Sequence, residues 1–345
     1  MKALRYFGPR DVRYESMDDP VLHDDRDVLV RVTGCAICGS DLHIYHGEGF
    51  SEDLGFCVGH EAVGEVVEIG RGVRRLKSGD RVMISAAVGC GACAACLRGD
   101  VIRCETGSAG CYGLSSRLQG SQAEAVRVPA GDFNAALIPE GISEEQALLM
   151  TDGMATAWYG ARNADISSGK TAAVVGLGPI GLMAVEQAFV LGAARVFAID
   201  PVAERRAIAE GLGATALHPD EAVETMRELT RGRMADSIVE AVGHARTIEL
   251  ALNLAGRRGT VSVIGVNQDR RFDFPMARAF MMGLTFRIGT CSVQETWPEL
   301  IPLVQSGRLK PERVISHRLP LSEGAEAYAM FDARKDGALK MVLTP

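Results

Sequence analysis

The sequence lacks the segments that would place a protein in or across a membrane. It contains no run of 18 or more apolar residues, the minimum for a candidate membrane-spanning helix. The start of the sequence, residues 1–6, shows no apolar h-region of the kind found in a secretory signal peptide. We therefore expect a cytoplasmic protein with no membrane partner.

Basic surface patches, repeats and low-complexity segments are missing as well. No stripe or run of Lys and Arg stands out, and the formal net charge is −7. We therefore expect no nucleic-acid partner. A chain of 345 residues is longer than one hydrophobic core usually organises, so its length predicts two domains.

Cysteine, in contrast, is abundant, with nine residues. Disulfides are rare in the cytosol, so metal sites and free thiols are expected. Four cysteines follow the spacing C-x2-C-x2-C-x7-C, which is typical of a closed, structural zinc site with four thiolate ligands. They are Cys90, Cys93, Cys96 and Cys104. We expect four others to be small buried apolar side chains, namely Cys35, Cys57, Cys111 and Cys291.

The texture of the sequence changes near residue 152. Before it, short β-type runs such as 28–32 and 62–69 alternate with glycines and predict a compact β-barrel-like domain. After it, strands expected at 171–175, 195–200, 236–240 and 259–264 alternate with helices at 180–191 and 202–212. This alternation predicts an α/β, doubly wound parallel sheet. We expect residues 281–288 to form an edge strand and residues 340–344 a last strand.

These textures predict domain limits. The first domain spans residues 1–153 and carries the cysteine lobe at about 89–105. The second spans 154–289, and residues 290–345 return to the first.

A glycine-rich turn follows the strand at 171–175 and opens a helix. It reads Gly176-Leu177-Gly178-Pro179-Ile180-Gly181, a G-x-G-x-x-G pattern in the context that a dinucleotide site requires. Gly176 allows the tight turn, Gly178 lets the backbone approach a pyrophosphate, and Gly181 lets helix and strand pack closely.

Asp200 ends the next strand, where a carboxylate binds the adenosine ribose. It would repel a 2′-phosphate, which favours NAD(H) over NADP(H). Arg205 could stack on adenine or hold a phosphate. The alternative is that Asp200 only caps the following helix.

Four motifs occur in a fixed order: C-G-S-D at 38–41, G-H-E at 59–61, the four-cysteine lobe and the glycine-rich turn. In this combination the whole chain resembles the zinc-dependent medium-chain alcohol dehydrogenase family. The resemblance implies a GroES-like β-barrel catalytic domain joined to a Rossmann cofactor domain. It also implies two zinc ions per chain, NAD(H), and a homodimer or homotetramer.

The resemblance implies that Cys38, His60 and Asp152 bind a catalytic zinc. Asp152 stands where other members have a second Cys, and a carboxylate donates less charge, so the ion should be a stronger Lewis acid. Glu61 would approach the metal during ligand exchange, and Asp41 would hold His60 in the required tautomer. Taken singly, each residue also has an ordinary structural reading, such as Asp152 capping the next helix.

The resemblance further implies that zinc lowers the pKa of a bound alcohol, whose alkoxide then gives a hydride to the nicotinamide. Ser40 would bind the substrate oxygen, and His43 would pass the proton to solvent through a ribose hydroxyl. Gly39 stands where some members have a basic residue for the pyrophosphate. We therefore expect Lys340, near the C-terminus, to contribute to phosphate binding.

The substrate is harder to predict. Gly39 and the small Ala86 favour the polyol, threonine and secondary-alcohol branches, with His46, Phe50 and Trp297 as candidates for the pocket wall or for ordinary packing. Residues 110–134 resemble glutathione-independent formaldehyde dehydrogenases. We expect an NAD(H)-dependent oxidation of a secondary alcohol or polyol, or the reverse reduction of its ketone. The alternatives are an aldehyde dehydrogenase or dismutase, and a non-catalytic, zinc-stabilised NADH-binding protein.

Overall fold

The computed structural model describes residues 1–49, 51–267, 269 and 271–345. The chain divides into two compact units, and the helix α5 (Gly153–Asn163) leads from one to the other. Unit 1 comprises Met1–Ala155 and Cys291–Pro345, and unit 2 comprises Thr156–Thr290. Among the described residues, no helix combines the length and apolar character needed to cross a bilayer.

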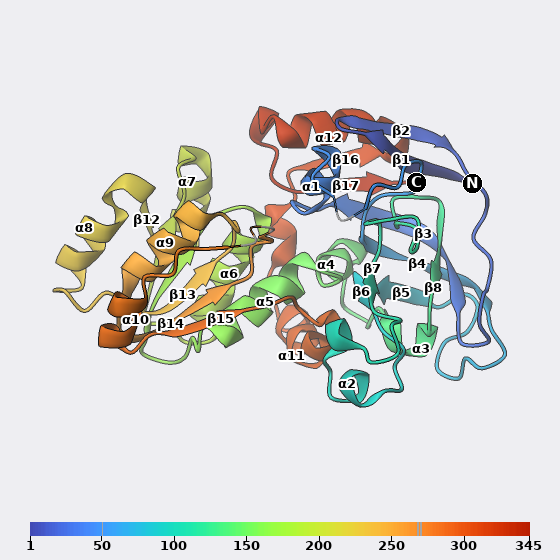
Figure 1. The fold of residues 1–345 in the computed structure, drawn as a ribbon. Coiled ribbons are helices and arrows are strands. Elements are labelled where there is room, and N and C mark those ends of the chain that lie inside the picture. Colours follow the sequence, from blue (N-terminus) through green and yellow to red (C-terminus); the bar gives the residue numbers. More distant parts are fainter. Residues whose placement is uncertain (50, 268, 270) are drawn as a thin grey trace. The chain divides into compact units, whose positions relative to one another are not determined.

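Unit 1 is built on a seven-stranded sheet in the order β16-β17-β3-β4-β5-β9, with β8 also paired to β3 (Figure 1). Its pairs are antiparallel except for the parallel pair of β16 and β17. The strands are β3 (Val28–Ile37), β4 (Glu61–Ile69), β5 (Arg81–Ile84), β8 (Ala125–Val128), β9 (Ala135–Leu137), β16 (His317–Pro320) and β17 (Met341–Thr344). Two small hairpin-like sheets complete the unit: β1 (Lys2–Gly8) with β2 (Asp11–Ser16), and β6 (Ala87–Val88) with β7 (Gly110–Cys111).

The core of unit 1 lies between these sheets and short helices. Val28, Val30 and Val32 alternate along β3 and all face this core, as the period of two in a strand requires. At α4, the Ser143 side chain accepts from Gln146 while the Gln146 side chain accepts from the Ser143 backbone, which fixes the start of the helix. The helices are α1 (Asp41–Tyr45), α2 (Ala94–Leu97), α3 (Gly131–Asn134), α4 (Glu144–Leu149), α11 (Val293–Gln305) and α12 (Gly324–Asp332). Single 3₁₀ turns are η1 (Val101–Arg103), η2 (Pro311–Val314), η3 (Leu321–Glu323) and η4 (Lys335–Gly337).

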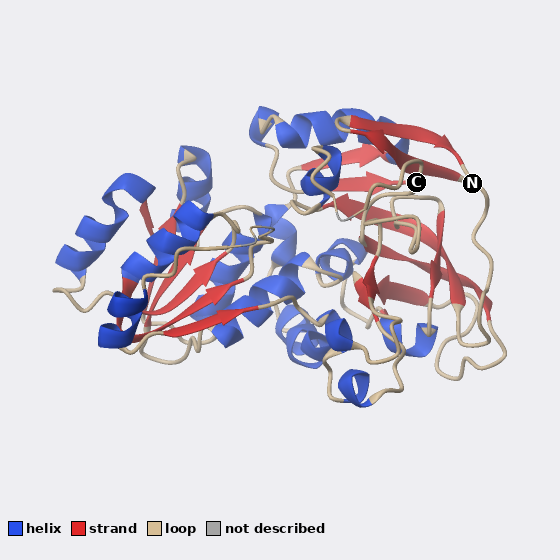
Figure 2. Cartoon of the chain, in the orientation of Figure 1, coloured by secondary structure: helices blue, strands red, loops and turns tan. Residues whose placement is uncertain are grey.

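Unit 2 is a six-stranded parallel sheet in the order β12-β11-β10-β13-β14-β15. Helices alternate with its strands along the chain (Figure 1), and blue helices lie beside the red strands of the sheet (Figure 2). The strand order is that of a doubly wound dinucleotide-binding fold. The predicted α/β class is therefore confirmed. The strands are β10 (Thr171–Val175), β11 (Arg195–Ile199), β12 (Thr215–Leu217), β13 (Ala235–Glu240), β14 (Ala255–Val263) and β15 (Thr285–Ile288). The helices are α6 (Pro179–Val190), α7 (Ala203–Gly211), α8 (Pro219–Leu229), α9 (Ala245–Leu254) and α10 (Met276–Met282).

The predicted edge strand at 281–288 is only half correct. β15 does lie at one edge of the sheet, but it begins at Thr285. Met281 and Met282 belong to α10, which ends at Gly283 in the left-handed conformation, with a φ of 63°. A glycine there ends a helix without steric cost, so the apolar run is divided between a helix and a strand.

Candidate active site

Three side chains of unit 1 converge on one point. The Cys38 Sγ lies 3.4 Å from Asp152 Oδ2, which lies 3.3 Å from His60 Nε2. The three potential ligand atoms are all within 4.8 Å of one another. Zinc bonds of about 2.0–2.3 Å in a tetrahedron separate ligand atoms by roughly 3.3–3.8 Å. The donor set therefore fits a zinc ion with three protein ligands, which leaves a fourth position for a small molecule.

The sheet register explains this convergence. Cys38 directly follows β3 and His60 directly precedes β4, and these strands pair with Ala36 opposite Glu61. The two residues therefore lie at the same end of neighbouring strands. Asp152 directly precedes α5 and completes the group.

Burial and charge prepare these groups for a cation. Burial raises the pKa of Asp152, but the hydrogen bond and charge of His60 outweigh this effect and bring it to about 2. Burial and the neighbouring carboxylates raise the pKa of Cys38, so in the absence of metal it is a thiol. A metal binding here must displace that proton, which couples metal affinity to pH.

The predicted neighbours Ser40, Asp41 and His43 lie in the segment that follows Cys38. Asp41 Oδ1 lies 3.2 Å from His60 Nδ1, while its Oδ2 accepts from the Cys38 amide at 2.9 Å. His60 Nε2 thus faces Asp152, and Ser40 Oγ is 3.3 Å from the same nitrogen. His43 lies on α1 with its side chain 26% exposed and its Nδ1 3.8 Å from Glu48 Oε2. From Ser40 to His43 the chain therefore leads from the buried ligand group toward solvent.

Gln122 and Tyr328 support Asp41, and the sequence analysis missed both. The Gln122 amide donates to the Ala36 carbonyl at 3.0 Å and lies 3.5 Å from Asp41 Oδ2, while its oxygen accepts from the Tyr328 hydroxyl at 2.9 Å. Gly59 makes room for this amide, since a Cβ there would lie 2.3 Å from Gln122 Cγ. Gly59, which directly precedes His60, is the local feature of the sequence that could have indicated this close contact.

Lys340 lies beside the candidate metal site. It is 2% exposed, and its ammonium donates to the Glu61 carboxylate and to the Ile37 carbonyl. Burial lowers the pKa of Lys340, but the Glu61 charge outweighs this effect and raises it overall. In this arrangement the ammonium predicted to bind the cofactor phosphate is committed to Glu61. The two residues are 279 positions apart, and no local pattern announces the pair.

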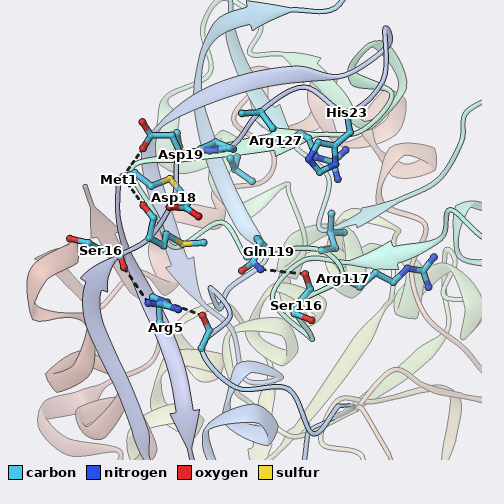
Figure 3. Close-up of a pocket in the computed structure, with 18 residues that line it drawn as sticks. Met1, Arg5, Ser16, Asp18, Asp19, His23, Ser116, Arg117, Gln119 and Arg127 are labelled. Carbon is cyan, nitrogen blue, oxygen red and sulfur yellow. Dashed lines mark hydrogen bonds and ion pairs between the residues drawn. The ribbon is translucent and has the colours of Figure 1, made fainter.

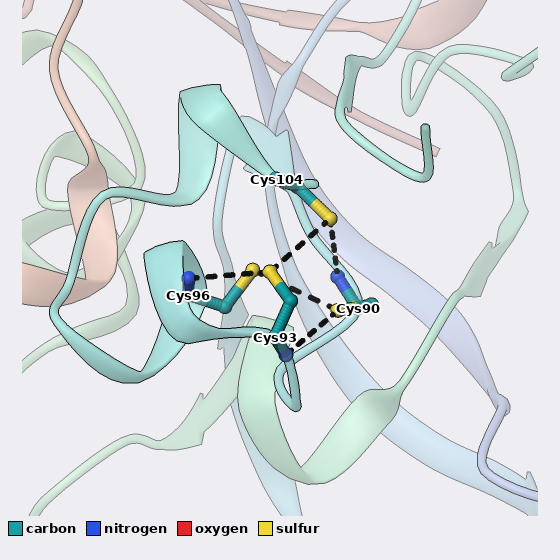
Figure 4. A group of neighbouring side chains, drawn as sticks. All are labelled: Cys90, Cys93, Cys96 and Cys104. Atoms are coloured by element: carbon teal, nitrogen blue, oxygen red, sulfur yellow. Dashed lines mark hydrogen bonds between the residues drawn. The ribbon is translucent and has the colours of Figure 1, made fainter. Parts of the chain in front are cut away.

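The four lobe cysteines also converge (Figure 4). The Cys90 and Cys96 sulfurs lie 3.9 Å apart, and those of Cys93 and Cys104 lie 4.0 Å apart. Two thiolates on one zinc are separated by about 3.8 Å, so this group fits a four-thiolate site. Burial raises the pKa of Cys104, but hydrogen bonds, first from Thr106, lower it to about 6. The lobe thus already favours a thiolate at one position.

In unit 2, the glycine-rich turn lies between β10 and α6. Gly176 has a φ of +89°, and a Cβ there would lie 2.3 Å from Val242 Cγ2, while one at Gly181 would lie 1.8 Å from the Gly176 oxygen. The fold itself therefore excludes side chains at both positions. A Cβ at Gly178 would meet no described atom within 4 Å. Gly178 thus leaves open space at the start of α6, where Pro179 and Ile180 begin the helix and a phosphate can approach.

Asp200 follows β11 and is buried. Its Oδ2 accepts from the Leu177 amide of the glycine-rich turn at 2.7 Å, and its Oδ1 accepts from the Val202 amide at 2.8 Å. Each oxygen keeps a further lone pair for a ligand. Arg205 Nη1 lies 3.9 Å from Oδ2, so the predicted arginine is close to the carboxylate.

The candidate pocket residues have other partners. His46 Nε2 lies 2.7 Å from Asp332 Oδ1, and the buried Trp297 donates its indole N–H to the Met150 carbonyl at 3.0 Å. Ala86 is buried, whereas Phe50 lies outside the described residues. Of the cysteines expected to be buried, Cys35, Cys57 and Cys291 are, and Cys111 is partly exposed.

A hollow of about 600 Å³ elsewhere in unit 1 is separate from these groups (Figure 3). Its lining includes Arg5, whose guanidinium donates to the carbonyls of Gly55 and Ser16, and Met1, whose ammonium pairs with Asp19. None of the predicted site residues that the structure describes lines it.

Comparison with known proteins identifies the family. Residues 24–140 match the model of the alcohol dehydrogenase GroES-like domain, and residues 179–306 match that of the zinc-binding dehydrogenases. A Mycobacterium tuberculosis protein named "Probable zinc-binding alcohol dehydrogenase" is 45% identical over 100% of this chain and 89% of its own.

Solved structures agree with this assignment. Alcohol dehydrogenase TADH from Thermus sp. ATN1 is 39% identical with a TM-score of 0.94, covering 100% of this chain and 99% of its own. A Sinorhizobium meliloti protein solved with NADP is 29% identical with a TM-score of 0.87, covering 100% and 99%. Together with the two convergent ligand groups, these matches show that the chain belongs to the zinc-binding alcohol dehydrogenase family.

Proposed function

We propose that this protein is an NAD(H)-dependent zinc alcohol dehydrogenase that oxidises a secondary alcohol or polyol, or reduces the matching ketone. The convergence of Cys38, His60 and Asp152 within 4.8 Å carries this proposal. Zinc held by these three residues supplies a Lewis acid that lowers the pKa of an alcohol. A purely structural site would need a fourth protein ligand, as the cysteine lobe has.

The neighbouring side chains supply orientation and proton transfer. We propose that Asp41, whose Oδ1 lies 3.2 Å from His60 Nδ1, holds the His60 ring with Nε2 toward the metal position. Ser40 places its hydroxyl beside that nitrogen, where it can hydrogen-bond the substrate oxygen. His43, partly exposed, can take up the proton and release it to water. We also propose, because the Ala86 side chain is small, a substrate that branches at the reacting carbon.

We propose NAD(H) as the preferred cofactor because Asp200 presents a buried carboxylate next to the glycine-rich turn. A 2′-phosphate would meet like charge there. Arg205 lies near Asp200, and one relative was solved with NADP, so the preference between the two cofactors has to be measured. The kcat/KM with NAD⁺ should exceed that with NADP⁺ clearly, and equal values would remove the case for Asp200.

A substrate panel tests the whole proposal. NAD⁺ reduction is followed by absorbance with secondary alcohols, polyols, threonine and formaldehyde, beside metal analysis of the same preparation. Two zinc ions per chain and turnover of a secondary alcohol or polyol are expected. Turnover of formaldehyde alone would favour the aldehyde-oxidising alternative. Complete inactivity with both zinc ions bound would favour a non-catalytic NADH-binding protein.

We also propose that the protein forms a homodimer or homotetramer through unit 2. β15 is an edge strand whose Ile288 is exposed, and Phe280 and Met281 of the adjacent α10 are exposed as well. An unpaired apolar edge is suited to pairing with a second copy. Light scattering should show a dimer or tetramer for the wild type and a smaller species for Ile288→Lys. A wild-type monomer would refute the proposal.

A further inference from the structure

The Glu61–Lys340 ion pair is linked to all three chain segments that carry a candidate ligand of the catalytic zinc. Glu61 directly follows His60 in the chain. Glu61 Oε1 accepts from the amide of Gly153, which directly follows Asp152, at 3.3 Å. Lys340 Nζ donates to the carbonyl of Ile37, which directly precedes Cys38, at 3.2 Å. The pair therefore ties together all three segments that carry a ligand.

Strand register places the pair at this point. β17 lies beside β3 with Met341 opposite Ile37, and β3 lies beside β4 with Ala36 opposite Glu61. Lys340, the residue before Met341, is thus brought to the end of β3. The termini of β17, β3 and β4 thus lie side by side next to the ligands, and the Lys340 side chain reaches from the start of β17 past β3 to Glu61 of β4.

Burial makes a general stabilising role a poor explanation. Glu61 and Lys340 are 0% and 2% exposed, so both charges are almost completely removed from water. An apolar pair of similar size is often as stable as a buried ion pair or more so. Charge offers a better reason. Zinc with the Cys38 thiolate and the Asp152 carboxylate sums to zero, and the buried Asp41 beside His60 already adds one negative charge. The Lys340 ammonium balances the further negative charge of Glu61.

We propose that Lys340, through its ion pair with Glu61, is a positioning residue that holds the three ligand-bearing segments in register for the catalytic zinc. The inference rests on the proposed function, because it assumes that zinc occupies this site. It assigns Lys340 to metal retention instead of cofactor phosphate binding. The zinc of the cysteine lobe should be indifferent to the pair, since in the described part of the chain the lobe sulfurs contact one another and nearby amides, and neither Glu61 nor Lys340.

The test compares the double variant Lys340→Met/Glu61→Gln with the wild type. It removes both charges together, so that no unpaired buried charge is left and no free carboxylate can bind the metal. Release of each zinc to a chelator is timed. We expect the catalytic zinc to leave about 10–100 times faster, the size of effect typical of residues that support metal ligands. The lobe zinc should leave at the wild-type rate.

A second ion pair in unit 1 provides a matched control. Arg127 Nη1 and Asp27 Oδ2 lie 2.9 Å apart, with side chains 20% and 2% exposed. Arg127→Met/Asp27→Asn should lower the melting temperature but leave both zinc release rates unchanged. Equal release from all three proteins, or equal acceleration in both double variants, would overturn the inference.

Glu61→Gln gives a second measurement should the double variant fold poorly. Its side chain keeps the shape and the oxygen that accepts from Gly153. With Co²⁺ in the catalytic site, the visible spectrum should shift because the ligand geometry relaxes. A wild-type spectrum with wild-type release would refute the positioning role. A wild type that holds no catalytic zinc would instead refute the proposed function.

Discussion

Cys38 shows how much of the proposed chemistry depends on one atom. Its sulfur is one of three ligands in a site where the fourth position must stay open. Cys38→Ala should therefore leave one zinc per chain, that of the lobe, and reduce alcohol-dependent NAD⁺ reduction to background. Metal analysis and the absorbance assay check both outcomes.

Cys35→Ala is the matched control for this variant. Cys35 lies three residues earlier, and its buried sulfur contacts the Leu343 carbonyl at 3.6 Å. Cys35→Ala should lower the free energy of unfolding by less than the truncation of a large core side chain does. Both zinc ions and the activity should remain. Loss of zinc from both variants would mean that packing, and not ligation, explains the effect.

His43 should matter most where protons are hardest to release. Its imidazole is partly exposed and lies on α1, three residues after Ser40. We expect His43→Ala to slow alcohol oxidation mainly below neutral pH, since at higher pH hydroxide in solvent can take the proton. The pH–rate profile measures this, with His46→Asn as control because His46 is paired with Asp332. A His43→Ala profile identical to wild type would exclude the relay.

At the scale of elements, the glycines of the glycine-rich turn have different roles, because the fold requires some of them and cofactor binding requires another. A Cβ at Gly178 meets no described atom within 4 Å, so we expect Gly178→Val to keep the melting temperature near that of wild type. It should weaken NADH binding by about tenfold or more, because the valine occupies the space that the pyrophosphate needs. Fluorescence titration with NADH and a thermal melt measure the two effects.

Gly211→Val controls for the substitution itself, because a Cβ at Gly211 also meets no described atom within 4 Å. It should retain wild-type NADH affinity. Gly176→Ala should behave oppositely to Gly178→Val, since its φ of +89° and the contact with Val242 strain the fold itself. NADH binding to Gly178→Val as tight as to wild type would contradict the role of this glycine.

Elements with a strong local signal could be predicted from sequence. Residues 171–175 form β10 as expected, because a continuous apolar run bounded by polar residues and glycine fits a buried parallel strand. The run at 281–288 misled because short apolar segments have no periodicity that separates strand from helix. Only the contacts of α10 and β15 within unit 2 decide where one ends and the other begins.

The candidate site was predictable where motifs are local. Cys38 and His60 belong to local motifs, Asp152 follows from the family resemblance that these motifs carry, and the structure brings the three ligand atoms together. Lys340 with Glu61, and Gln122 with Tyr328, join residues 279 and 206 positions apart. Strand register brings Lys340 to Glu61, whereas a loop and the helix α12 bring Gln122 to Tyr328, and composition and spacing encode neither arrangement.

For the molecule as a whole, the cysteine lobe should contribute stability first. Cys96 is buried within the four-sulfur group, so Cys96→Ser should lose the lobe zinc and lower the melting temperature. For a unit of this size, a loss of about 2 kcal/mol lowers it by roughly 4–8 °C. Freshly prepared variant should turn over alcohol at a rate close to wild type until it unfolds. Immediate inactivity in a folded sample that retains its catalytic zinc would contradict this separation.

The position of β17 has a consequence for how the protein is made. This strand lies inside the sheet of unit 1, between β16 and β3, yet the ribosome adds it after the whole of unit 2. Residues 156–290 are contiguous and can fold as soon as they emerge, whereas the sheet of unit 1 must wait for residues 341–344. Until then, the nascent chain has neither Lys340 nor a closed sheet around Cys38 and His60. Zinc capture at the catalytic site would then be among the last steps of biosynthesis, and the lobe, whose ligands span only residues 90–104, could load its metal far earlier.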